Sequence, residues 1–194
     1  MNIQIFLSCL ESYESSDIDE FQKELKGRGI EVISESRDNE VNACNEWFMP
    51  TAIVAGIGGA FIAEIGKDLY GEVKKYLSDL TQKTMAKPRI EPIFIGTPGK
   101  IDKSNPFTNA FSIYSETKSN ARFKLLIPKY SHDINYGEII YGYLDFLKDY
   151  NDGLISESDI GLLDQSKIKS NVLLVQFNTE TKVIEWVDPS KGLK

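Results

Sequence analysis

The first forty residues alternate between strand-like and helix-like hydrophobic patterns. Residues 3–10 (IQIFLSCL) form an apolar run that is too short for a helix and therefore predicts a strand. Residues 17–28 repeat apolar side chains every three to four positions, which predicts a helix, and residues 30–35 (IEVISE) alternate as a second strand. A helix between two strands over so short a span predicts a βαβ unit with parallel strands.

The next regular pattern predicts a long helix from about Trp47 to Met85. Pro50 suits its first turn, because the N–H that proline lacks has no partner within the helix at that position. The second half of the stretch is amphipathic, with one apolar face. That face consists of Ile65, Leu69, Val73, Leu77 and Leu80.

The remaining chain predicts mainly strands. Residues 90–95 (IEPIFI) predict a strand at a sheet edge, because Pro92 cannot donate to a neighbouring strand. The elements expected after it are a hairpin over 110–115 and 122–127, a helix over 136–150, and a second hairpin over 172–177 and 182–187.

This order of elements predicts an α/β fold with a mixed sheet. The sheet should be parallel at the N-terminal βαβ unit, with antiparallel hairpins towards the C-terminus, and helices should cover it, including the long helix near 47–85. A length of 194 residues fits a single α/β domain spanning residues 1–194.

The segment 47–66 is the most unusual part of the chain. It has 17 consecutive residues without a charge, from Trp47 to Ala63, and small residues recur at every fourth position. One interpretation is a helix buried against the sheet, where small residues allow close packing. The alternative is a membrane-inserting or helix-pairing segment, since a bilayer span needs about 17 to 25 apolar residues and small residues favour helix contact in lipid.

Charge is distributed unevenly along the acidic chain. The 22 Lys and Arg against 29 Asp and Glu give a net charge of −7. Residues 1–46 carry −7 and residues 130–194 carry −5, whereas residues 67–129 carry +6. This balance excludes a generally basic nucleic-acid binder. Segregated charge favours oriented association with a protein partner or with further copies of the chain.

Cysteine and histidine usage argues against a metal or redox site. Cys9 and Cys44 are far apart and fit no metal-binding or redox spacing, and His132 is the single histidine. We therefore expect no metal and no cofactor. The N-terminus has no basic segment before its short apolar run, so we expect no signal peptide, and a reducing cytoplasm is the expected compartment.

Candidate ligand-binding residues follow from the predicted βαβ unit. Open α/β sheets bind ligands beyond the carboxyl ends of their parallel strands, which places Ser8, Cys9, Glu35 and Asp38 nearest such a site. Lys100, in the turn-rich sequence IGTPGKIDKS, is a further candidate through weak anion binding by the backbone N–H groups around it. No complete catalytic motif is present, so no catalytic residue is assigned.

Three features of residues 3–38 resemble the opening of TIR-type domains: IFLS at the end of the first strand, the sequence FQKELKGRGIEV, and Arg37-Asp38 in the following loop. The Pro-Gly that usually follows the Arg-Asp pair in that family is replaced here by Asn39-Glu40, and the family's catalytic glutamate maps onto no position. The resemblance implies a divergent scaffold for protein contacts more than a nucleotide hydrolase. Residues 61–77 also resemble a helical stretch of uncharacterised bacterial proteins.

The leading hypothesis is an acidic, cytoplasmic, bacterial protein-interaction module, with a protein partner or a homo-oligomer as the expected assembly. Two alternatives stay open. One is a nucleotide-processing enzyme of NAD-hydrolase type, with its site beside Ser8 and Glu35. The other is a membrane-acting effector that uses residues 47–66.

Overall fold

The computed structural model describes residues 4–38, 51–58, 65–86, 105–164 and 171–189. Its strands are β1 (Gln4–Leu10), β2 (Glu31–Arg37), β3 (Ile53–Ile57), β4 (Phe107–Glu116), β5 (Arg122–Pro128), β6 (Leu173–Asn178) and β7 (Val183–Trp186). Its α-helices are α1 (Ser16–Gly27), α3 (Lys67–Met85) and α4 (Tyr136–Asn151), and a short 3₁₀ turn, η1 (Glu11–Tyr13), follows β1.

One mixed sheet of seven strands organises the described residues, in the order β2-β1-β3-β4-β5-β6-β7. Parallel and antiparallel pairs alternate across it: β2–β1, β3–β4 and β5–β6 are parallel, while β1–β3, β4–β5 and β6–β7 are antiparallel. The predicted α/β class, the parallel first βαβ unit and the two hairpins are therefore confirmed. The other two parallel pairs, β3–β4 and β5–β6, were not expected.

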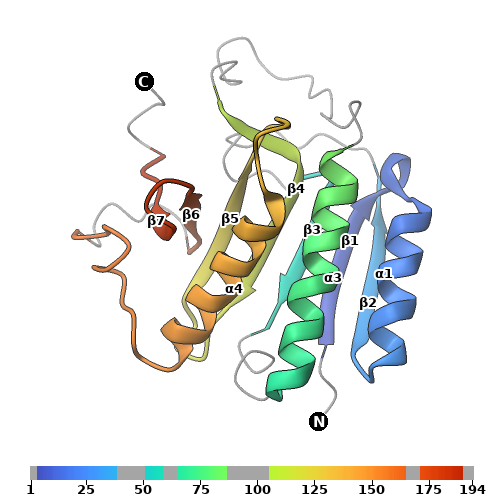
Figure 1. The fold of residues 1–194 in the computed structure, drawn as a ribbon, viewed down its shortest axis with the longest axis horizontal. Helices are drawn as coiled ribbons and strands as arrows, with labels where there is room; N and C mark the ends of the chain where they lie inside the picture. Colours follow the sequence, from blue (N-terminus) through green and yellow to red (C-terminus); the bar gives the residue numbers. More distant parts are fainter. Residues whose placement is uncertain (1–3, 39–50, 59–64, 87–104, 165–170, 190–194) are drawn as a thin grey trace.

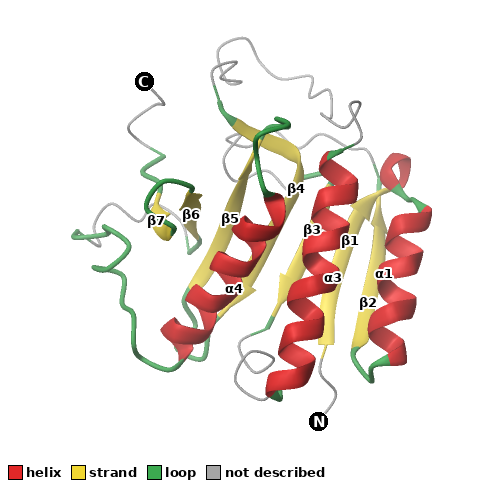
Figure 2. Cartoon of the chain, viewed as in Figure 1, coloured by secondary structure: helices red, strands yellow, loops and turns green. Residues whose placement is uncertain are grey.

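All three helices pack on the same face of this sheet, as Figures 1 and 2 show. Period-two alternation directs one set of strand side chains to this layer, so Ile5 and Leu7 of β1 are fully buried whereas Phe6 between them is 39% exposed. The helices contribute their apolar stripes, including Phe21, Leu77 and Leu144. We call the opposite face of the sheet the reverse face.

The long helix predicted over 47–85 is wrong in its first part. Ile53–Ile57 form β3, and the helix begins only at Lys67. Because β3 lies between β1 and β4, both of its backbone edges are paired, and its odd-numbered side chains enter the core. A short apolar run of this kind is typical of a central strand and cannot be distinguished from a buried helix by periodicity alone.

The membrane-inserting interpretation required a helix through this segment, and residues 53–57 form a strand of the sheet instead. Within the described residues, no helix is both long and apolar enough to cross a bilayer. The strand predicted at 90–95 lies outside the described residues. β4 begins at Phe107, three residues before its predicted start.

Candidate functional site

The structure brings together two of the predicted site residues, Ser8 and Glu35. They are opposite each other in the parallel register of β1 and β2, and Ser8 Oγ donates a hydrogen bond to Glu35 Oε1 at 3.0 Å. Both lie on the reverse face. Ser8 is only 3% exposed, whereas Glu35 is exposed. The Glu35 carboxylate is therefore accessible to solvent, whereas the Ser8 hydroxyl is buried.

Cys9 points to the other side of the sheet and packs in the helix-covered core. Its Sγ donates to the backbone oxygen of Glu35 at 3.9 Å. Burial raises the pKa of the Cys9 thiol, the nearby Glu14 raises it further, and Arg37 opposes both effects. A buried thiol that stays protonated is a poor nucleophile, so Cys9 acts as a small core residue.

Arg37 occupies a position that the sequence named only through the TIR-type resemblance. From the end of β2 it reaches across the reverse face, and its Nη2 donates to the carbonyl oxygens of Thr51 at 2.6 Å and Ala52 at 3.2 Å. Burial lowers the pKa of the Arg37 guanidinium, and the nearby Cys9 and Glu35 oppose this effect. Its Nε is buried without a hydrogen-bond partner among the described residues. Arg37 thus ties β2 to the beginning of β3, across β1.

Further polar side chains continue across the reverse face. Thr51 Oγ1 donates to the carbonyl of Ile53 at 2.6 Å, which leaves the Ser112 hydroxyl as the donor in the 2.7 Å bond between Ser112 and Thr51. Lys124 is 2% exposed, with its Nζ at 5.5 Å from the centre of the Tyr114 ring. Buried hydroxyls that are hydrogen-bonded in this way contribute to the stability of the sheet and are not poised for reaction.

A shallow groove of about 430 Å³ lies on the same face near Phe6, Ile33 and Tyr114. Its floor is Gly56, where an added Cβ would meet the Phe6 Cβ at 3.1 Å. Phe6 and Ile33 are 39% and 42% exposed, so an apolar surface remains open beside the outermost strand.

No hydrogen bond or ion pair links Asp38 to this region among the described residues, and the remaining candidate cannot be placed in it. Asp38 follows β2 directly and is exposed. Lys100 lies outside the described residues. Within the described part of the chain, no group of three or more His, Cys, Asp or Glu side chains is arranged to hold a metal ion. His132 contacts the Tyr130 hydroxyl through Nδ1 at 3.0 Å, in the loop after β5.

The feature that sequence reasoning missed is the outer edge of β2. This strand ends the sheet among the described elements, and five of its seven residues are exposed. The strand at the opposite end, β7, has four residues, and its Trp186 N–H donates to the Ile160 oxygen at 2.8 Å, so a loop contacts that edge. Natural proteins commonly protect sheet edges by shortening or covering them. β2 is seven residues long, and no other described strand pairs with its outer edge.

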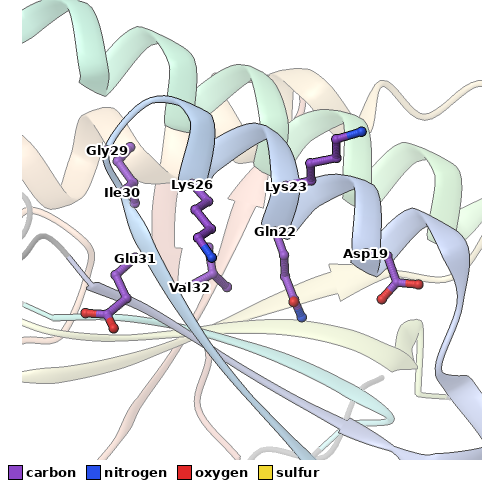
Figure 3. A pocket seen from close by; sticks show the side chains of 8 residues that line it. All are labelled: Asp19, Gln22, Lys23, Lys26, Gly29, Ile30, Glu31 and Val32. Carbon is purple, nitrogen blue, oxygen red and sulfur yellow. The ribbon is translucent and has the colours of Figure 1, made fainter.

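A groove of about 640 Å³ runs along this edge, between α1 and β2. Figure 3 shows its lining, with α1 side chains above the beginning of β2. The residues that form it are Asp19, Gln22, Lys23, Lys26, Gly29, Ile30, Glu31 and Val32. The only sequence signal for an edge would have been the polar, charged composition of β2, which loops share.

Comparison of the chain with family models, with curated proteins and with solved structures gives no match.

Proposed function

We propose that this protein is a protein-interaction module that associates through the outer edge of β2. The observation that supports the proposal is the seven-residue edge strand, exposed along most of its length at the end of the described sheet. An exposed edge has backbone N–H and C=O groups that can pair with a strand of another chain, and such pairing is a recurrent mode of protein recognition. The apolar side chains of Phe6 and Ile33 lie beside it and add contact area. A scaffold of TIR type, in a bacterial cytoplasm, is compatible with this role.

Replacement of Ile33 by glutamate tests the proposal. A carboxylate at this position places a solvated charge where a partner strand would pack, on the face that already carries Glu35, so we expect Ile33→Glu to abolish association. Val183→Glu is the matched control, since Val183 is a β-branched residue that is 51% exposed on the strand at the other end of the sheet. The measurements are sedimentation velocity of the purified protein and mass spectrometry of proteins captured from the source organism.

Association of wild type and Val183→Glu, with loss in Ile33→Glu, supports the proposal, whether the partner is the same chain or another one. Equal association of all three proteins, or a wild type that remains alone in both measurements, overturns it. Circular dichroism of each variant establishes that the fold is retained.

A nucleotide-processing enzyme of NAD-hydrolase type is the second candidate. The observation that favours it is the hydrogen bond between the Ser8 hydroxyl and the Glu35 carboxylate, because a carboxylate at the carboxyl end of a parallel strand can act as a general base. The 3% exposure of Ser8 restricts access of a substrate to the hydroxyl, which is why this candidate ranks second.

Nicotinamide release from NAD⁺, followed by chromatography, decides this candidate. If Glu35 is catalytic, the Glu35→Ala variant loses activity by about a hundredfold or more. Glu180→Ala, which removes an exposed carboxylate from the turn between β6 and β7, leaves the rate unchanged. No turnover by the wild type contradicts the enzymatic function.

A further inference from the structure

We propose that the partner at the β2 edge is a second copy of this chain, related by a twofold axis at Ser34. The inference rests on the proposed function and specifies its partner. Two copies of β2 would pair antiparallel and join the two sheets into one. Such an interface is isologous, so the same surface must be complementary to itself.

The register follows from the strand. A twofold axis at Ser34, the central residue of Glu31–Arg37, pairs all seven residues. Glu31 then lies opposite Arg37 of the second copy, and Ile33 lies opposite Glu35. No like charges face each other directly, and like charges in that position would destabilise the pair. The two Ile33 side chains become diagonal neighbours on the reverse face, within reach of each other.

Helix α1 supplies a second, independent complementarity. Its inner flank contacts α3, through the ion pair between Glu20 and Lys83 and a hydrogen bond from the Tyr76 hydroxyl to Glu24 at 2.9 Å. Its outer flank carries Asp19 and Lys26, two turns apart and both exposed. Neither forms an ion pair with another described residue. A twofold axis would bring Asp19 of each copy to Lys26 of the other.

The pairing of the β2 strands and the contacts between Asp19 and Lys26 place the twofold axis at a similar position along the sheet edge. Lys26 and Val32 both line the groove at this edge (Figure 3). The midpoint between Asp19 and Lys26 is three and a half helical residues from Lys26, about 5 Å along the helix. Ser34 is two strand residues beyond Val32, about 7 Å. Counted from these two groove residues, the offsets along the helix and along the strand are similar.

In this pairing the two α1 helices would lie side by side across the twofold axis. The groove of about 640 Å³ between α1 and β2 would then be covered by α1 of the second copy. Contact between helices matters because a stable interface buries on the order of 1,000 Å² or more, which a strand pair alone does not provide.

Charge exchange on α1 tests this arrangement by sedimentation equilibrium. Asp19→Lys and Lys26→Asp each replace two attractive contacts by two repulsive ones, and we expect each to weaken dimerisation by about tenfold. A mixture of the two single variants restores both attractive contacts, in a mixed dimer. Native mass spectrometry should therefore find the mixed dimer in preference to either homodimer. Equal proportions of all three dimers, or unaltered affinity of the single variants, overturn the proposal.

Cysteine cross-linking tests the register. Residues directly opposite in an antiparallel pair have Cα atoms about 4.5–5.5 Å apart, within the range for a disulfide. In a Cys44→Ser background, Ser34→Cys should form a covalent dimer on oxidation. Ser36→Cys, two residues along the same face, lies opposite Val32 of the second copy and should cross-link at least tenfold less. Cys9 is 4% exposed and does not compete.

Equal cross-linking of the two variants, or none in Ser34→Cys, contradicts the twofold axis at Ser34. The outcomes also separate this inference from the function on which it rests. A monomeric protein that captures another protein through Ile33 removes the second copy as the partner and leaves the interaction module intact. Association that Ile33→Glu does not affect removes both.

Discussion

Replacement of Ala55 by aspartate is expected to destabilise the protein by about 4 kcal/mol or more, a large part of the 5–15 kcal/mol that stabilises a typical domain. Ala55 is fully buried in β3, opposite Leu7 of β1 and Ile113 of β4. A carboxylate there would be removed from water among apolar side chains, which is costly even if the group becomes protonated. Urea unfolding followed by circular dichroism measures the loss.

Val54→Asp is the matched control for this variant. Val54 is the preceding residue of the same strand, but it is only half-buried and its side chain lies on the reverse face, so we expect a clearly smaller destabilisation. The comparison tests the alternation of β3 directly. Equal losses for the two variants would contradict a strand with one face in the helix-covered core.

Truncation of Phe123 to alanine is expected to lower the free energy of unfolding by about 3–5 kcal/mol. Phe123 is fully buried in β5, where its ring makes edge-on contacts with Phe146 and Tyr150, with centroids 5.2 Å and 5.1 Å apart. The variant loses this burial and leaves a cavity between the sheet and α4. The urea midpoint should fall without a change in the slope of the transition.

Phe6→Ala is the control, since this phenylalanine is 39% exposed on the reverse face. We expect it to cost about 1 kcal/mol or less. A loss for Phe123→Ala no larger than that for Phe6→Ala would show that α4 does not pack on β5 as the structure describes. The two phenylalanines thus compare the covered and the open face of the sheet.

Local periodicity was sufficient for the elements whose pattern has a single interpretation. The apolar stripes of α1 and α4 follow helical spacing, and their bounds agree with the structure to within a residue or so. The hairpin strands β6 and β7 were located as closely. The segment around β3 was misassigned because five consecutive apolar and small residues fit a buried strand and a buried helix equally well.

The candidate site was predictable only where it follows from adjacent parallel strands. Ser8 and Glu35 meet because equivalent positions of β1 and β2 are in register, which the βαβ pattern implies. The reach of Arg37 to Thr51 and Ala52 required knowing that β3 lies beside β1, on the side away from β2. Sequence spacing contains no information on that neighbour.

The amino-acid sequence was enough to establish the α/β class, the first βαβ unit and the identity of most helices and strands, because hydrophobic periodicity records which side of an element is buried. The strand order is a property of the assembled sheet, since it depends on how all the elements share one core. That order places β3 inside the sheet, between β1 and β4, buries Cys9 away from solvent and leaves β2 as an open edge among the described strands. An edge differs from an inner strand in its neighbours and not in its own residues, so the edge on which the proposed association rests became visible only in the folded chain.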